Sequence, residues 1–367
     1  MTQAEGAVAS DAGRHERRAY YAQARANYPF NHWWIAATAS EIGRARLLSR
    51  RILGLPVMFY RRVDGTVVAL EDRCPHRGTP LSLGWLEQDR VVCGYHGLRF
   101  APDGRCVRIP TQEQIPRHAC VRAYPVVESG PFVWIWTGAP EQADTHQVPL
   151  HPWLTDARWV AALGYIHVKA NYMMLKENVL DLTHFAYVHR STFEMDDDYG
   201  AAPACTVENG QVSFRQDFLN KPLPPFYGDA CGLGSKPVDR HDLGTSLSPA
   251  EHVFTAQIVN REPAAGERAE YFVKFQHMTT PETPISHHYW WVMARDHGLG
   301  EAGRAWMQTV IEAGFAEDKI ILEAIQAQAE STPWPAQAVE ISVAADRAGL
   351  QARRQAEALI ALERDRV

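Results

Sequence analysis

Two short motifs, each pairing one cysteine with one histidine, constrain this chain of 367 residues more than any other feature. The first reads Cys74-Pro75-His76, and the second, separated from it by sixteen residues, reads Cys93-Gly94-Tyr95-His96. Each motif brings a soft thiolate and an imidazole into one tight loop, and Gly78, Gly94 and Gly97 permit the tight turns and close backbone approach that such loops need. We therefore predict that Cys74, His76, Cys93 and His96 together hold one metal centre.

Two kinds of metal centre suit two cysteines and two histidines. Zinc accepts this ligand set, but its usual sequence pattern pairs Cys with Cys and His with His. In a Rieske [2Fe–2S] cluster both thiolates bind one iron and both imidazoles bind the other, so each loop contributes one ligand of each kind. The mixed motifs favour the Rieske cluster and leave zinc as the alternative.

The sequence around these motifs resembles a known family. Residues 74–78 (Cys-Pro-His-Arg-Gly) and 93–100 (Cys-Gly-Tyr-His-Gly-Leu-Arg-Phe) are similar to the Rieske fingerprint of ring-hydroxylating and demethylating oxygenases. The resemblance extends from about Asn31 to the tail and is greatest to oxygenases of the vanillate O-demethylase and dicamba monooxygenase type. It implies a terminal oxygenase component in which the cluster supplies electrons to a mononuclear non-haem Fe(II) that activates O₂.

A second group of candidate ligands lies in the apolar stretch 178–189, which contains Asp181, His184 and His189. Two His and one carboxylate form the ligand set of non-haem Fe(II) oxygenases, which leaves coordination positions free for O₂. His184 and His189 are about 140° apart on a regular helix, so both reach one metal only if the helix ends, bulges or widens between them. The alternative is that His189 simply occupies a helix C-terminus, where a cation is favoured.

The resemblance implies the remaining iron-site residues. It assigns the third ligand to Asp318, with Glu317 and Glu323 as rival carboxylates on what could be a solvated helix face. It also places Asn178 beside the iron as a residue that shapes the site.

Asp181 receives a bridging role from the same resemblance. Its carboxylate is expected to accept hydrogen bonds from His184 and from His96 of the partner subunit, which would fix both tautomers and join the two metal centres. This arrangement implies a ring-shaped homo-oligomer, and we expect a trimer.

The substrate pocket is less well defined by the sequence. The resemblance suggests His277 as a substrate-binding residue, and an ordinary core histidine is the alternative. Residues 221–251 contain several Pro and Gly with little periodicity, which predicts a long loop that forms a wall or lid of the pocket. Several cations could meet an acidic substrate there, and the pattern does not choose among Arg215, Lys221, Lys236, Arg240 and His241.

The fold expected from these patterns is α+β. After a lead-in over residues 1–30, closely spaced segments rich in Val, Phe, Tyr and Trp predict an all-β Rieske domain over 31–140. The Pro-rich segment 138–152 is the predicted linker, and 150–367 is the predicted catalytic domain, with an antiparallel sheet and helices that carry the mononuclear iron. Its predicted helices are Tyr172–His189, Gly303–Glu330 and Ala345–Arg366, and its predicted strands are Gln211–Phe218, Val253–Val259, Ala269–Met278 and His287–Ala294.

Composition sets the expected surroundings of the protein. A formal net charge of −6 gives no reason to expect nucleic acid, and the absence of a long apolar run or an N-terminal apolar segment predicts no membrane span and a cytoplasmic location. Six cysteines are too few for a disulfide scaffold. Four of them are interpreted as ordinary thiols, namely Cys106, Cys120, Cys205 and Cys231.

The expected activity follows from the resemblance. We expect an oxygenase component that hydroxylates or demethylates, at O or N, a substituted aromatic compound such as an aromatic acid, in aromatic catabolism. No Gly-x-Gly-x-x-Gly fingerprint is present, so a separate reductase of the flavin or ferredoxin type must deliver electrons from NAD(P)H. The alternatives are a cis-dihydroxylating ring dioxygenase and, in a different class, a Rieske electron-transfer protein without oxygenase activity.

Overall fold

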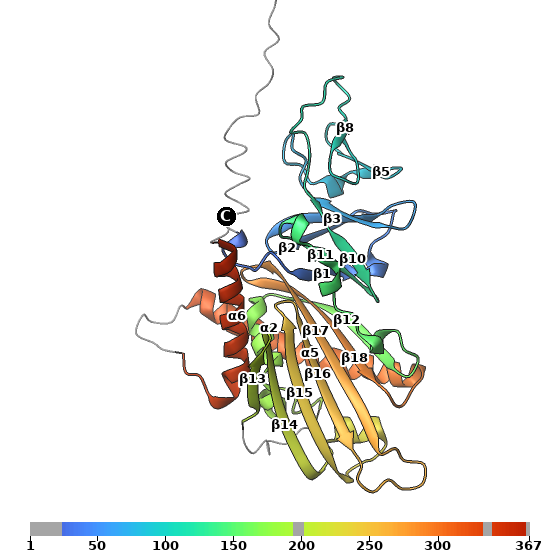
Figure 1. Ribbon diagram of the computed structural model, residues 1–367, viewed down its shortest axis with the longest axis vertical. Helices are drawn as coiled ribbons and strands as arrows, with labels where there is room; N and C mark the ends of the chain where they lie inside the picture. The colour runs from blue at the N-terminus through green and yellow to red at the C-terminus, as the bar shows by residue number, and fades with distance from the viewer. Residues whose placement is uncertain (1–23, 194–201, 333–339, 365–367) are drawn as a thin grey trace, which may run out of the picture.

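The computed structural model describes residues 24–193, 202–332 and 340–364. A β-rich part follows the N-terminus, and a large antiparallel sheet with helices follows it (Figure 1). The predicted fold class is therefore confirmed. Most of the predicted lead-in, residues 1–23, lies outside the described residues.

The β-rich part contains small antiparallel sheets, ordered β1-β11-β10, β2-β3-β4-β9 and β5-β6-β7-β8 among the described residues. The sheet that carries β5 and β8 lies farthest from the large sheet (Figure 1). The strands are β1 (Trp33–Thr38), β2 (Leu48–Ile52), β3 (Leu55–Arg61), β4 (Val67–Glu71), β5 (Trp85–Glu87), β6 (Arg90–Val92), β7 (Arg99–Phe100), β8 (Cys106–Arg108), β9 (Ala123–Tyr124), β10 (Val126–Ser129) and β11 (Phe132–Trp136). Short 3-10 turns lie at η1 (Ala39–Glu41) and η2 (Leu81–Leu83). Two more, η3 (Pro140–Gln142) and η4 (Thr145–Gln147), occupy the predicted linker, and η5 (Pro152–Leu154) begins at its last residue.

The large sheet has the strand order β12-β18-β17-β16-β15-β14-β13, and every neighbouring pair is antiparallel. Its strands are β12 (Val160–Val168), β13 (Ala204–Glu208), β14 (Gln211–Pro222), β15 (Pro237–Ser248), β16 (Glu251–Val259), β17 (Glu270–Thr283) and β18 (Ser286–Arg295). The helical segments are α2 (Tyr172–Val179), η6 (Leu182–His184), α3 (Phe185–Val188), α4 (Pro225–Cys231), α5 (Glu301–Ser331), η7 (Ala344–Asp346) and α6 (Arg347–Arg364).

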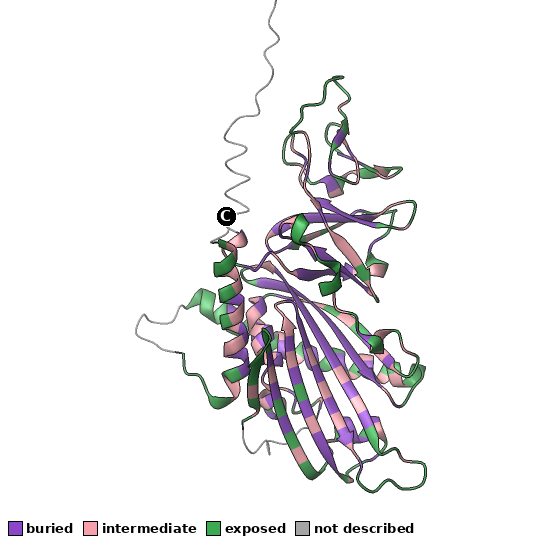
Figure 2. Cartoon of the chain, viewed as in Figure 1, coloured by how far each residue is buried: buried purple, intermediate pink, exposed green. Residues whose placement is uncertain are grey.

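Strand β18 is buried along its whole length because both of its faces are covered. Alternate side chains point to opposite faces of a strand. Tyr289 and Trp291 belong to the core on the helix side, whereas Trp290 and Val292 belong to the core shared with strands β1 and β11. Figure 2 shows the same pattern, with the middle strands of the sheet mostly buried. The large sheet is therefore a middle layer between the β-rich part and the helices.

Two helices complete the helical layer. Helix α5 lies along the sheet beside β12. Helix α6 packs on α2, where the guanidinium of Arg353 donates two hydrogen bonds of 2.6 and 2.7 Å to the carboxylate of Glu177. In the described part of the chain, no helix has the length and apolar character needed to cross a membrane.

Several predicted elements need correction. The expected loop over 221–251 is wrong, because these residues form the end of β14, helix α4 and strand β15. The expected single helix over 172–189 is wrong as well, because it breaks at Leu180 and Asp181 into α2, η6 and α3. Strands β12 and β13 were not predicted, while the four predicted strands and the two C-terminal helices are present.

Candidate functional site

The two Cys/His loops have the same backbone conformation. The Gly78 N–H donates to the Cys74 carbonyl at 2.9 Å, and the Gly97 N–H donates to the Cys93 carbonyl at 3.0 Å. Both glycines have positive φ angles, 73° and 72°, which residues with a Cβ rarely adopt. The spacing of cysteine and glycine in each motif therefore makes two matching turns that face one another.

The four side chains divide into a buried pair and an exposed pair. Cys74 and Cys93 are 2% and 1% exposed, and their thiols lie next to each other. His76 and His96 lie at the surface with ring centroids 4.6 Å apart. The structure thus brings the two thiols together on the inside and the two imidazoles together on the outside.

This arrangement fits a [2Fe–2S] cluster. Burial, together with the neighbouring Cys93, raises the pKa of the Cys74 thiol to about 11, whereas backbone N–H groups of His76 and Arg77 point at its sulfur. Such a thiol ionises when a metal takes the place of its proton. Thiolates inside and imidazoles outside correspond to the separate irons of a Rieske cluster.

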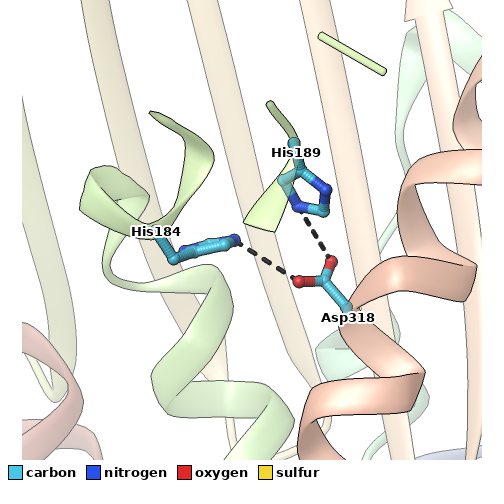
Figure 3. A group of neighbouring side chains, drawn as sticks. All are labelled: His184, His189 and Asp318. Carbon is cyan, nitrogen blue, oxygen red and sulfur yellow. Dashed lines mark ion pairs between the residues drawn. The ribbon is translucent and has the colours of Figure 1, made fainter. Parts of the chain in front are cut away.

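A second group of ligand atoms comes from His184, His189 and Asp318. Among the described residues, these three form the one His/Cys/Asp/Glu group whose ligand atoms all lie within 4.8 Å of one another. His184 Nε2 is 3.5 Å from Asp318 Oδ1, and His189 Nε2 is 3.3 Å from Asp318 Oδ2 (Figure 3). The four residues of the Cys/His loops form no group of this compactness, which suits a centre with two separated irons.

The break in the helix lets both histidines face Asp318. Helix α2 ends at Val179, Asp181 caps the 3-10 turn η6, and α3 is a single turn that ends before His189. This bears out the requirement that the helix end or change pitch around His184 and His189. His189 is 0% exposed, so it is not a solvated cation at a helix C-terminus.

Hydrogen bonds to Nδ1 orient both imidazoles. The His184 Nδ1–H donates to the Asp181 main-chain carbonyl at 2.5 Å, and the His189 Nδ1–H donates to Glu317 Oε2 at 2.9 Å. Both Nε2 atoms are buried and have no hydrogen-bond partner among the described residues. Unpaired buried nitrogens are costly unless a ligand occupies them, so the side chains fit a metal ion bound between the two Nε2 atoms and Asp318.

The charges of the triad suit a divalent cation. Burial lowers the pKa of His184, which favours the neutral, metal-binding form. Burial opposes protonation of His189 too, but Asp318 and Glu317 outweigh it and raise its pKa. The Asp318 pKa is lowered by hydrogen bonds and by both imidazoles despite burial, so this carboxylate stays ionised. A bound metal ion can therefore take the place of the proton that His189 attracts.

The rival carboxylates have other partners. Glu317 accepts hydrogen bonds from His189, from Thr192 Oγ1 at 2.6 Å and from Ser191 Oγ at 3.0 Å. Glu323 accepts from Lys319 Nζ at 2.6 Å and from the backbone N–H of Lys169 at 2.8 Å. Glu317 therefore supports a histidine, and Glu323 stands away from the ligand atoms.

Asn178 and Asp181 flank the triad. The Asn178 Nδ2 amide donates to Asp318 Oδ1 at 3.1 Å. Asp181 Oδ1 accepts from the Thr183 backbone and hydroxyl, at 2.9 and 2.7 Å. Contrary to expectation, the contact with His184 is made by the Asp181 carbonyl, because the carboxylate is committed to capping η6. The described residues give Asp181 Oδ2 no hydrogen bond.

An aromatic cavity adjoins the triad. It has a volume of about 30 Å³, and His277 lines it with Nδ1 hydrogen-bonded to the Tyr289 hydroxyl at 2.7 Å. Burial lowers the pKa of His277 to about 3, which keeps its ring neutral. Its other lining residues are Asn178, Val179, Leu182, His184, Phe185, Phe193, Phe226, Phe254, Phe275, Phe315 and Asp318.

The composition of this lining differs from the expectation. None of the five predicted cations lines the cavity. Ligand pockets usually measure about 300–1,000 Å³, so an aromatic molecule enters this cavity only if phenylalanine side chains move. The phenylalanines were missed because they come from elements far apart in the sequence, and no local pattern marks them as a group.

Two family models match the chain. The Rieske [2Fe-2S] domain matches residues 32–125. The vanillate O-demethylase oxygenase C-terminal domain matches residues 168–362, which is more than half of the chain.

Individual relatives agree with these models. The toluene-4-sulfonate monooxygenase system iron-sulfur subunit of Comamonas testosteroni is 37% identical over 80% of this chain and 87% of its own length. The vanillate O-demethylase oxygenase subunit of Pseudomonas sp. (strain HR199) is 32% identical over 92% of this chain and 96% of its own length. A crystal structure of dicamba monooxygenase bound to 3,6-dichlorosalicylic acid superposes with a TM-score of 0.81 and 29% identity, covering 92% of this chain and 99% of that one.

Proposed function

The chain belongs to the Rieske non-haem iron oxygenases of the vanillate O-demethylase type, and we propose that it is the oxygenase component that hydroxylates or demethylates an anionic aromatic compound. One observation carries the proposal. A buried pair of unpartnered imidazole Nε2 atoms converges on Asp318 beside an aromatic cavity, in a chain that also carries the paired Cys/His loops.

The family's two cofactors are a [2Fe–2S] cluster and a mononuclear iron. We assign the cluster to Cys74, His76, Cys93 and His96, and the iron to His184, His189 and Asp318. Once bound, the iron supplies O₂ activation with electrons delivered by the cluster. The protein's own contribution is to hold the ligands, orient the substrate and exclude water.

Individual residues have definite tasks in this scheme. Asn178 holds Asp318 through Oδ1, so the carboxylate keeps one orientation toward both histidines. Glu317 and the Asp181 carbonyl fix the imidazole tautomers, which leaves each Nε2 lone pair for the metal. The aromatic lining keeps water from the bound substrate and packs against its ring.

The substrate class is proposed from the relatives and from His277. The relatives' names include a sulfonate, toluene-4-sulfonate, together with vanillate and dicamba. His277 lines the cavity as a neutral ring and can donate or accept one hydrogen bond to such a group. Hydroxylation of a methyl carbon beside O or N gives a hemiacetal or hemiaminal, which collapses and releases formaldehyde.

The cluster and the iron are proposed to communicate across a subunit contact. In one chain, the sheet that carries the cluster loops lies at the end of the β-rich part farthest from the large sheet (Figure 1). The two histidines of the cluster site are exposed. The ring of Tyr95, which is 64% exposed, packs on the ring of His96, and the two ring centroids are 3.8 Å apart. A homo-oligomer, with a trimer favoured, would set His96 of the partner subunit against Asp181, whose Oδ2 is available.

Electrons come from a separate reductase of the flavin or ferredoxin type that oxidises NAD(P)H. We propose a cytoplasmic location, which suits six cysteines that form no disulfide among the described residues.

The test is a substrate screen with a surrogate reductase and the iron-loaded protein. Methoxylated and N-methylated aromatic carboxylates and sulfonates are supplied with NADH, and formaldehyde is measured together with O₂ consumption. The proposal predicts formaldehyde in step with substrate loss. A cis-dihydrodiol product without formaldehyde would instead establish the dioxygenase, and NADH oxidation without any substrate oxidation would leave only electron transfer.

A further inference from the structure

A second cavity, of about 680 Å³, lies beside the catalytic cavity on the helix side of the large sheet. Residues from α4, the end of β18 and the start of α5 line it. Phe226 of α4 lines the catalytic cavity, and its ring stacks on Trp306, which lines the second cavity, at a centroid distance of 5.7 Å. The two cavities therefore share an aromatic wall.

Arg295 is the last residue of β18 and lines the second cavity. It occupies the same strand face as Tyr289 and Trp291, at alternate positions, so it points toward the helices. Its exposed fraction is only 5%, and its guanidinium lies 5.2 Å from the centroid of the Trp306 ring. A cation is thus buried at the wall that separates this cavity from the catalytic one.

The guanidinium of Arg295 lacks an anionic partner. Its Nη2 donates to the Gly298 carbonyl at 3.2 Å, and its Nε is buried without an acceptor among the described residues. No described carboxylate lies within ion-pairing distance. Burying an unpaired charge is unfavourable, and burial lowers the pKa of Arg295 accordingly. An anion from solution would remove this penalty.

The carboxylates nearby are engaged elsewhere or do not reach Arg295. Asp296 pairs with Arg268 at 2.5 Å and accepts from His297 Nδ1 at 3.0 Å. Asp229 lines the cavity at the surface without forming an ion pair with Arg295. Of the basic groups in the lining, Arg268 and His297 are thus engaged by Asp296, and the guanidinium of Arg295 is the one left without a carboxylate partner among the described residues.

Two glycines make room for this guanidinium. A Cβ on Gly298 would lie 2.8 Å from Arg295 Nη2, and a Cβ on Gly303 would lie 2.5 Å from the same atom. Gly298 also has a φ of 56°, a conformation that favours glycine. The loop into α5 and its first turn are therefore built around the unpaired cation.

We propose that this cavity binds the oxyanion group of an aromatic carboxylate or sulfonate, with the anion on Arg295 and the ring against Trp306. Guanidinium pairs two oxygens of such a group at once, and an aromatic ring adds stacking on the indole. Because the cavity adjoins the much smaller catalytic cavity, it serves as the site where substrate is captured before it enters. This second role rests on the proposed function, whereas binding of the anion does not.

The direct test is crystallography of the holoenzyme soaked with 4-bromobenzoate or 4-bromobenzenesulfonate, with neutral bromobenzene as the control. The expected result is anomalous bromine density against Trp306 with the oxyanion on Arg295 for at least one of the two acids, and none there for bromobenzene. The two acids distinguish a carboxylate site from a sulfonate site. An empty cavity with both acids, or equal occupancy by bromobenzene, would overturn the proposal.

A variant tests the same site in solution. Arg295→Gln should weaken anion binding at this cavity roughly ten- to a hundredfold, the loss expected for a charge-assisted hydrogen bond, and Arg295→Lys should restore part of it. Arg304→Gln removes a nearby charge that does not line the cavity, and it should leave anion binding unchanged. Equilibrium dialysis with labelled benzoate and toluene-4-sulfonate measures binding, and the Rieske absorption shows that each variant is folded.

Turnover adds a readout that separates capture from chemistry. Arg295→Gln should raise KM for an anionic substrate with little change in kcat. Unchanged dialysis isotherms in a folded Arg295→Gln protein contradict anion binding even if the enzyme is active. Binding in the cavity without any oxygenase activity contradicts the proposed function alone.

Discussion

At the scale of single residues, the two histidines of the triad depend on what holds Nδ1. Each ring has its Nδ1–H committed to an oxygen, the Asp181 carbonyl in one case and the Glu317 carboxylate in the other. Such partners set the tautomer and the direction of Nε2, and their removal commonly costs metal affinity.

Glu317 provides a prediction with a matched control on the same helix. Glu317→Ala should lower the affinity of the mononuclear site for Fe(II) about 10- to 100-fold, because His189 loses the partner that orients it. Glu323→Ala should leave iron affinity unchanged, since Glu323 binds Lys319 instead. Iron titration followed by the turnover rate measures both. Equal effects of the two substitutions would contradict the role of Glu317.

A pH dependence follows from the raised pKa of His189. A protonated imidazole cannot bind a metal, so protons compete with iron most strongly below this pKa. We expect the mononuclear site to lose affinity for iron as the pH falls through the raised pKa of His189, while the cluster absorption persists. Iron content after dialysis at a series of pH values tests this. An iron affinity that does not fall with pH would show that the competition is absent.

The ligand atoms of His184, His189 and Asp318, which motif and resemblance indicate as the iron ligands, meet in the structure. The sequence indicates their surroundings less well. The roles of the adjacent carboxylates Glu317 and Asp318 cannot be predicted from the sequence, because only the packing of α5 decides which one meets His189 Nδ1 and which one meets Nε2.

At the scale of elements, the interruption between α2 and α3 positions the site. A continuous helix would point His184 and His189 in different directions. Asp181 caps the start of η6, and His189 caps the end of α3. The backbone therefore changes direction at both ends of residues 181–189.

Helix α5 provides a prediction at Gly314. A Cβ at this position would lie 2.5 Å from the ring of Phe193, which lines the catalytic cavity. The Phe193 ring also packs on the His189 ring, with their centroids 4.6 Å apart. Gly314→Ala should therefore lower stability by about 1–3 kcal/mol, as overpacking does, and should lower kcat by displacing Phe193.

The control is Ala313→Ser at an exposed position of the same helix, which should have little effect on stability or on kcat. Thermal unfolding and turnover of the iron-loaded variants are the measurements. A Gly314→Ala protein with native or higher stability and full kcat would show that Phe193 has room to move.

The predicted strands are marked by the apolar pattern of their own residues, whereas a missed strand depends on pairing with its neighbours in the sheet. Strand β18 is predicted by the continuous apolar run Tyr289–Ala294, and the strand is buried along its whole length. Strand β15 contains charged residues and a glycine, and it exists because β14 and β16 pair with it on both sides. Pairing between distant strands is not visible in a local pattern, which is why the sequence of residues 221–251 predicts a loop.

At the scale of the whole molecule, the proposed path from cluster to iron crosses between subunits. This predicts complementation between two inactive variants in one oligomer. Cys93→Ser should remove the cluster and His184→Ala should remove the iron, and each homo-oligomer should be inactive. Co-expressed and co-purified, the two should regain part of the activity, because an intact cluster of one chain then faces an intact iron of the other.

Tagged chains purified in tandem isolate the mixed oligomers for this assay. Mixed oligomers that remain as inactive as either parent would show that electrons travel within a single chain. Asp181→Asn in both chains should abolish the recovered activity with both metals still bound, since the link to His96 of the partner subunit would be weakened.

The proposed chemistry needs two iron centres of different kind in one chain, and metal content measures this most directly. The prediction is about three irons and two acid-labile sulfides per chain, with His184→Ala reduced to about two irons and an unchanged Rieske EPR spectrum. This prediction would be contradicted by two irons in the unaltered protein or by zinc in place of iron. Loss of the Rieske spectrum in the His184→Ala variant would contradict it as well.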